Sequence, residues 1–252
     1  MLTKKFRQKY REKIRKIKNR CAQKFQEQNN RFVNILRHDI KTPILAQIRA
    51  LEFVLADDLK KESREILQES LSSNKFLLDV IQNTIFLADF ENRKHTMKLE
   101  KVNLLQEIEK MWASVKEYAD IKQQNLVIKT KGKQEINVMA DKTMLEKIIQ
   151  NLLAGSIAYG FENSDIEVIL KENKNALSMF AKNKSIYMTK DKLDSLFERK
   201  QDEDISQGDL NKLGMKLNLN VAKKLISAHN WDIVASSKKD DSSVFGFIAK
   251  KN

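Results

Sequence analysis

Two long apolar stripes at helical spacing occupy the first 91 residues and restrict this region to long helices. The first runs through residues 4 to about 55 and ends with Leu36, Ile40, Ile44, Ile48, Leu51 and Leu55. The second, from residue 62 to 91, alternates spacings of four and three through Leu67, Leu71, Asn74, Leu78, Ile81, Ile85 and Ala88. This heptad pattern is typical of helices that pack along a seam. The break at residues 56–63 predicts a hairpin, and because one hairpin leaves its flanks uncovered, we expect a dimeric four-helix bundle.

The only proline of the chain, Pro43, lies inside the first stripe, in the sequence RHDIKTPIL. A proline in a helix interior removes one backbone N–H, costs about 3 kcal/mol and bends the helix. His38 precedes it by five residues and lies two positions from both Leu36 and Ile40, which we assign to the core. The histidine is therefore expected to point away from the seam, toward solvent, close to a bend.

After residue 92, short strand-like segments alternate with helices, which indicates an α+β domain. Helices are predicted at residues 104–121, 142–159 and 217–228. Strands are predicted at residues 95–99, 125–130, 136–140, 165–172, 176–182, 231–237 and 243–250. Gly132 lies in the turn between the second and third strands, and residues 199–212 are polar and loop-like. Mainly antiparallel pairing then gives a sheet with helices on one face.

Charge and cysteine content indicate where the protein resides. The net charge is +13, of which the first 20 residues carry +9, so the folded remainder is only mildly basic. A single cysteine, Cys21, excludes an internal disulfide and fits a reducing compartment. The sequence has no run of 18 apolar residues and no secretory leader, so we expect a cytoplasmic protein.

The basic segment, residues 1–20, has three interpretations. It is the exposed start of a coiled coil, or a juxtamembrane segment at the inner face of an anionic membrane, next to a membrane sensor missing from this chain. Nucleic-acid binding is the third, and it is disfavoured because the segment has no aromatic platform and no recognition-helix pattern.

The motifs of the chain resemble those of sensor histidine kinases of two-component signalling. The six residues His38 to Pro43, HDIKTP, match the family's H-[DE]-x-[KR]-[TS]-P box completely. The second half is similar to the ATP-binding domain shared with gyrase-type ATPases and Hsp90. This similarity rests on MADKTMLEKIIQNLLAG before and within the N-box, LDSLFER at the F-box, and LGMKLNLNVAKKLISAHNWDIVASS from the G2 box on. The resemblance covers residues from about 30 to 250.

The resemblance implies three regions and a phosphoryl-transfer site. Residues 1–29 would form a basic coiled-coil or juxtamembrane helix, 30–92 the dimerisation and histidine phosphotransfer domain, and 93–252 a degenerate ATP-binding-like catalytic domain. His38 would accept the phosphoryl group and exchange it with an aspartate of a response regulator receiver domain. Asp39 would hold the imidazole tautomer, Thr42 would position the water that hydrolyses the aspartyl phosphate, and Pro43 would bend the helix.

The expected cofactors are ATP and Mg²⁺, but the matching nucleotide site departs from the family pattern. Asn151 and Tyr159 are retained, whereas Gly155 stands at the metal-ligand asparagine and Ala158 replaces a basic residue. Asn183 replaces the aspartate that reads adenine, and Ser185 and Tyr187 replace glycines of the G1 box. In the G2 box Gly214 remains, while Lys216 and Asn218 replace glycines that would let backbone approach phosphate.

Three functions remain open. The chain is an active histidine kinase with altered ATP ligands, or a pseudokinase that acts as a response-regulator phosphatase or phosphotransfer protein. The eroded nucleotide site favours the second. The third is a coiled-coil adaptor without phosphoryl chemistry. Replacing His38 with glutamine would leave the cellular phenotype of an adaptor unchanged, whereas a phosphotransfer protein would lose its function.

Overall fold

The computed structural model describes residues 2–92, 96–197, 210–239 and 242–250, with side chains from residue 14 on except at 22 and 210–216. The chain divides into two compact units, residues 1–94 and 95–252.

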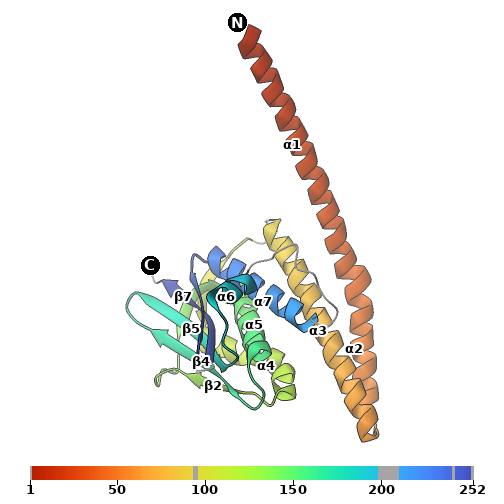
Figure 1. The fold of residues 1–252 in the computed structure, drawn as a ribbon, viewed down its shortest axis with the longest axis vertical. Helices are drawn as coiled ribbons and strands as arrows, with labels where there is room; N and C mark the ends of the chain where they lie inside the picture. Colours follow the sequence, from red (N-terminus) through yellow and green to blue (C-terminus); the bar gives the residue numbers. More distant parts are fainter. Residues whose placement is uncertain (1, 93–95, 198–209, 240–241, 251–252) are drawn as a thin grey trace. The chain divides into compact units, whose positions relative to one another are not determined.

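The first unit is a helical hairpin. Its first arm comprises α1 (Leu2–Asn34), the π-helical turn η1 (Ile35–Ile40) and α2 (Lys41–Leu55), and its second arm is α3 (Lys61–Glu91) (Figure 1). The predicted helix over residues 4–55 is therefore helical throughout but changes its winding at η1, and the predicted second helix is confirmed.

The wide turn η1 ends at Ile40, three residues before Pro43. Pro43 has no N–H and its ring crowds the carbonyl of residue 39, so the ordinary i→i−4 pattern cannot continue. The Lys41 N–H instead bonds to the Leu36 carbonyl, five residues back. The extra residue in the turn corrects one prediction: Ile40 is 37% exposed rather than in the core, while Leu36 and Ile44 are buried.

The two arms pack through a continuous apolar cluster. Its buried members are Leu36, Ile44, Ile48, Leu71 and Ile81, with Leu51, Leu55, Leu78 and Ile85 packed against them. Every member of the predicted heptad seam on α3 is buried or half-buried, from Leu67 to Ala88. Burial of this apolar surface, at roughly 25 cal/mol per Å², stabilises the hairpin.

The second unit is a sheet covered by helices on one face (Figure 1). Its helices are α4 (Leu104–Ile121), α5 (Lys142–Tyr159), α6 (Lys190–Leu196) and α7 (Leu210–Ala228). A five-stranded sheet has the order β2 (Asn125–Lys129), β4 (Asp165–Glu172), β5 (Ala176–Lys184), β7 (Ser242–Lys250) and β6 (Asp232–Lys238). A separate two-stranded sheet pairs β1 (Leu99–Asn103) with β3 (Asn137–Asp141).

The register of the large sheet places the core on one face. Met179 of β5 pairs with Leu170 of β4 and with Phe247 of β7, and all three side chains are at most 1% exposed. Neighbouring residues on the opposite face, such as Phe180, are only half-buried. This alternation is what an antiparallel sheet with one packed face requires, and it confirms the α+β prediction.

Three details differ from the sequence prediction. The strand expected at residues 95–99 is β1, at 99–103, because it pairs with β3 and not with a sequence neighbour. The two segments flanking Gly132, whose φ is +83°, do not pair with each other: β2 runs parallel to β4. Helix α7 begins at Leu210, seven residues before the predicted start. Residues 193–197 of the F-box lie in and just after α6, whereas residues 198–209, which include the rest of the F-box and most of the predicted loop, lie outside the described residues.

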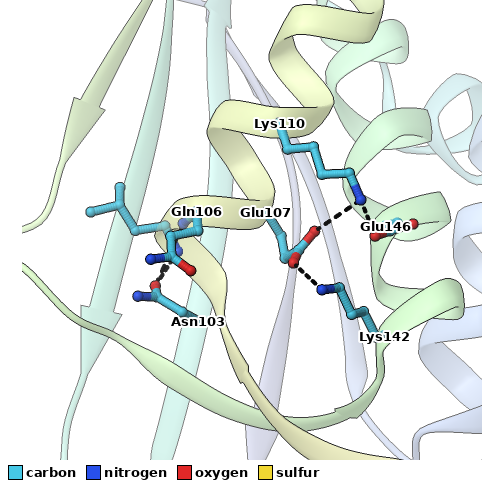
Figure 2. Close-up of polar contacts among 7 residues, drawn as sticks. Asn103, Gln106, Glu107, Lys110, Lys142 and Glu146 are labelled. Atoms are coloured by element: carbon cyan, nitrogen blue, oxygen red, sulfur yellow. Dashed lines mark hydrogen bonds and ion pairs between the residues drawn. The ribbon is translucent and has the colours of Figure 1, made fainter.

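A buried carboxylate joins α4 to α5. Glu107 of α4 is 6% exposed and lies 3.2 Å from Lys142 and 3.9 Å from Lys110, which also bonds to Glu146 (Figure 2). The hydrogen bond to Glu146 raises the pKa of Lys110. Just before this cluster, the Asn103 side chain caps α4 by accepting from the Leu105 and Gln106 N–H groups (Figure 2).

Candidate functional site

The histidine box lies on the first arm of the hairpin. His38 and Asp39 belong to η1, whereas Thr42 and Pro43 belong to the first turn of α2, and all four side chains are exposed. An exposed neutral imidazole has a free nucleophilic nitrogen. Within the described residues, no hydrogen bond joins His38 to Asp39, so the expected carboxylate–imidazole contact stays a prediction.

The residue before His38 contacts the other arm. Nη2 of Arg37 lies 2.7 Å from Oδ2 of Asp89 on α3, and both side chains are about one-third exposed. Sequence reasoning missed this pair, since 52 residues separate its members and neither belongs to a recognised motif.

The predicted nucleotide residues gather around α5. Asn151 is buried in the middle of α5, and its amide donates to the Lys147 carbonyl at 2.7 Å. Tyr159 ends the helix, with its ring centroid 6.0 Å from that of Phe245 on β7. Gly214 and Lys216 fall within α7, in the stretch 210–216 for which the structure describes the backbone only.

Leu219 packs against Gly155, the position at which the family pattern has its metal-binding asparagine. A Cβ built on Gly155 would lie 2.9 Å from Cδ2 and 3.2 Å from Cγ of Leu219, a fully buried residue of α7. Distances this short are below ordinary van der Waals contact. The glycine lets α5 and α7 approach closely, and it offers no oxygen to a cation. This end of the site therefore does not fit Mg²⁺.

The C-terminal end of α5, just after Gly155, holds polar atoms that lack partners. Asn183, at the end of β5, donates to the Ser156 carbonyl at 2.7 Å, which leaves its buried Oδ1 as an acceptor without a hydrogen bond. Ser156 Oγ and Gln124 Oε1 are likewise buried and unbonded. A Cβ on Gly160 would meet the Gln124, Ser156 and Asn183 side chains or backbone within 3.2 Å, so these groups converge around that glycine.

Buried unbonded polar groups are costly, at about 1–3 kcal/mol each, and they indicate a missing partner. Because the Ser156 carbonyl fixes the Asn183 amide orientation, the free atom is an acceptor that suits a donor such as an amino group. Asn183, the residue predicted to read adenine, therefore presents an acceptor of the type that an amino group bonds, whereas Gly155 presents no metal ligand.

Two further groups of residues shape this end and were missed from sequence. Nζ of Lys122 donates to the carbonyls of Ile157, Ala158 and Gly160 at 2.8–3.1 Å, which caps the end of α5, and burial lowers the pKa of this lysine. A chain of hydroxyls runs from Ser185 to Ser243 (2.6 Å) and on to Ser237 (3.1 Å). Its tertiary pairing has no signature in the sequence.

The described residues were also compared with the features of a membrane-spanning helix and of a metal site. Among the described residues, no helix combines the length and hydropathy needed to cross a bilayer. In the same residues, no three histidine, cysteine, aspartate or glutamate side chains are grouped as a metal site would require.

Comparison with known proteins identifies relatives of both units. Residues 140–251 match the family described as histidine kinase-, DNA gyrase B-, and HSP90-like ATPases. Sensor protein DltS of Streptococcus agalactiae strain NEM316 is 26% identical over 212 residues, covering 83% of this chain and 51% of that protein. The chain thus spans about half the length of that relative.

Solved structures share the fold. The Acinetobacter baumannii histidine kinase AdeS aligns with a TM-score of 0.58 and 17% identity, covering 85% of this chain and 98% of that one. Histidine kinase ThkA in complex with response regulator protein TrrA aligns with a TM-score of 0.55 and 16% identity, covering 90% and 65%.

Proposed function

The chain belongs to the sensor histidine kinase family, and from that premise we propose that it is a two-component signalling protein phosphorylated on His38. The partner would be a response regulator receiver domain, whose aspartate exchanges the phosphoryl group with His38. The observation that carries the proposal is the complete HDIKTP box, which spans the end of the wide turn η1 and the first turn of α2 and exposes His38. Exposure is required because a second protein must reach the imidazole.

The chemistry needs only groups of this chain at the acceptor. The imidazole nitrogen of His38 forms a bond to phosphorus while the bond to the donor's leaving group breaks, and the ring's proton leaves. Asp39, the neighbouring carboxylate, would favour the protonated ring as charge develops. The Thr42 hydroxyl would hold the water that attacks the receiver's aspartyl phosphate in a separate hydrolysis, which breaks the P–O bond to the aspartate and releases inorganic phosphate.

A chemical donor tests the acceptor independently of ATP. Phosphoramidate should phosphorylate the wild-type full chain, because its P–N bond breaks as ammonia takes the proton released from the imidazole. The label should be acid-labile and absent from His38→Gln. Label that persists in His38→Gln would show that another residue is the acceptor. Absence of label from the wild type would refute the proposal.

A second function, that of a pseudokinase, is favoured by one observation: Leu219 takes the space next to the metal-ligand position. Phosphoryl transfer from ATP needs a metal held against the phosphates. We propose that the adenine end binds nucleotide weakly through Asn183 while ATP-dependent phosphorylation of His38 is absent. The protein would then act as a phosphatase or phosphotransfer protein.

Calorimetry with ATP, with and without Mg²⁺, separates this candidate from an ordinary kinase. The pseudokinase should show weak binding that Mg²⁺ does not strengthen, and Asn183→Leu should abolish it. Robust labelling of His38 from Mg-ATP would instead establish an active kinase.

The basic segment is proposed to lie at an anionic membrane surface, where each basic residue contributes about 1 kcal/mol. Co-sedimentation of the full chain with vesicles that contain phosphatidylserine should fall as salt rises. Neutral vesicles are the control, and equal binding to both would contradict the proposal.

A further inference from the structure

The histidine-bearing stretch has little apolar anchorage to the second arm. Leu36 and Ile44 are buried, but His38, Asp39, Ile40, Thr42 and Pro43 between them are all exposed. The wide turn has moved Ile40 out of the core. For about two helical turns the first arm therefore lacks buried apolar contacts that would fix its rotation and its distance from α3.

A polar contact lies where the apolar ones are missing. Arg37 donates to Asp89 at 2.7 Å. Among the described residues, residues 37–43 make no other side-chain hydrogen bond. Both side chains are about one-third exposed, so the pair is partly shielded from solvent. A guanidinium–carboxylate contact also constrains direction, because the donor fork is planar.

The backbone hydrogen bonding of the wide turn gives this contact its importance. A π-helical turn is rare and is usually confined to one turn, and here the proline that follows cannot restore an ordinary backbone bond. The local backbone therefore resists displacement less than a regular helix does. Arg37 is adjacent to His38, so movement of its Cα relative to α3 moves the imidazole with it.

We propose that Arg37 is a positioning residue, whose ion pair with Asp89 holds the wide turn against α3 and so fixes the direction of His38 for phosphoryl exchange with a receiver domain. The inference rests on the proposed function. A small donor can reach an exposed imidazole in many orientations. A receiver domain is held by the hairpin surface and must find the phosphorus in line with its carboxylate, and small misplacements cost about a hundredfold.

The test compares loading by phosphoramidate with transfer to a receiver domain that accepts phosphate from the wild-type phosphohistidine. In the transfer step the P–N bond to His38 breaks, a P–O bond to the aspartate forms, and the imidazole regains a proton. Arg37→Gln and Asp89→Asn should each slow transfer about ten- to hundredfold while loading stays within about twofold. Amide hydrogen exchange of residues 37–42 should become faster in both variants.

Rescue separates positioning from simple structural loss. The exchanged pair Arg37→Asp with Asp89→Arg should recover most of the transfer rate and the amide protection, and Arg37→Lys should recover part. The matched control is Glu52→Gln, which removes a second cross-arm ion pair, 3.2 Å to Lys75, far along the hairpin from His38. It should leave loading and transfer unchanged.

The possible results distinguish a failure of the positioning role of Arg37 from a failure of the proposed function. Wild-type transfer by Arg37→Gln, or a charge-exchanged pair as slow as the single variants, would overturn the inference, the latter because Arg37 would then contact the receiver itself. A wild type that phosphoramidate cannot load would refute the proposed function instead. Hydrogen exchange in the single and exchanged variants would then decide whether the Arg37–Asp89 ion pair holds the wide turn against α3.

Discussion

His229 is held neutral by two backbone groups at the end of α7. Its Nδ1 lies 2.8 Å from the Leu225 carbonyl and must donate, whereas its Nε2 accepts from the Asp141 N–H at 3.1 Å. The ring also stacks on Trp231, with centroids 4.5 Å apart. Because both nitrogens are engaged, this histidine is a poor phosphoryl acceptor, which agrees with the prediction that His38 is the phosphorylated histidine. His95 lies outside the described residues.

The same geometry predicts a pH dependence. Burial lowers the pKa of His229, with the Leu225 hydrogen bond and the Asp141 carboxylate opposing in part. Because the pKa of His229 is lower in the folded protein than in the unfolded chain, the unfolded chain takes up the proton at a higher pH. The contribution of His229 to the free energy of unfolding is therefore fully present above pH ~6.5 and decreases as the pH falls below that value. Unfolding monitored by tryptophan fluorescence should show this loss between about pH 7 and 5. The His229→Gln variant should show a smaller slope, and an equal slope in both proteins would contradict the prediction.

Variants of Thr42 and Asp39 should separate hydrolysis of the receiver's aspartyl phosphate from phosphoryl transfer at His38. Thr42→Ala should lower dephosphorylation of the receiver domain more than transfer to or from His38, because only hydrolysis needs a positioned water. Asp39→Asn should do the opposite, since imidazole attack releases a proton. Both rates can be measured with one labelled receiver domain. Equal losses of both rates in both variants would point to general damage of the wide turn.

At the scale of elements, the periodic patterns predicted helices and the helix-facing strands well. The bounds of α4 and α5 agree with the sequence prediction to the residue, because each begins at a capping side chain, Asn103 or Asp141, and carries a regular apolar face. The position of β1 could not be derived, because its pairing partner lies about 40 residues away. The wide turn was also missed: Pro43 signals a bend, but not which residues absorb it.

The predicted nucleotide site likewise has features that the sequence could predict and features that it could not. The replaced glycines are visible in the sequence, so a departure from the family pattern could be predicted. What fills the space could not, because Leu219 reaches Gly155 only through the packing of α7 on α5.

Packing between α5 and α7 predicts the outcome of restoring the missing asparagine. Gly155→Asn should destabilise the protein by about 1–3 kcal/mol through overpacking against Leu219, less the few tenths gained in helix propensity. Combining it with Leu219→Ala should cost less than the two single changes together, because the sites share one contact. Denaturant unfolding measures these values. Calorimetry should find no Mg²⁺-dependent gain in ATP binding, and a clear gain would show that Gly155 alone disables the metal site.

At the scale of the whole molecule, the part of α1 whose side chains the structure describes presents an exposed apolar stripe. Ile14, Ile17, Phe25 and Phe32 are 40–72% exposed, and Cys21 is exposed on the same stripe. A long helix whose composition is this polar gains little from propensity alone and needs a packed face. A second copy in parallel would supply it, and Asn74, on the α3 seam, would help to set the register. The basic charges of the first 20 residues oppose close approach, so this dimer should tighten as salt rises.

Cys21 makes the orientation of that dimer measurable. It is the only cysteine, so any disulfide-linked dimer must join Cys21 to the Cys21 of a second copy. A disulfide needs Cα atoms about 4.4–6.8 Å apart, which a parallel pair of stripes provides and an antiparallel pair does not. Mild copper-catalysed oxidation of the full chain should therefore give a covalent dimer that dithiothreitol reverses and Cys21→Ser abolishes. Random collisions would give a yield that rises steadily with protein concentration, whereas a preformed parallel dimer gives a plateau. A dimer detected by sedimentation that fails to cross-link at Cys21 would contradict the parallel arrangement, and a monomer at tens of micromolar, a concentration well above ordinary micromolar dissociation constants, would contradict the dimer itself.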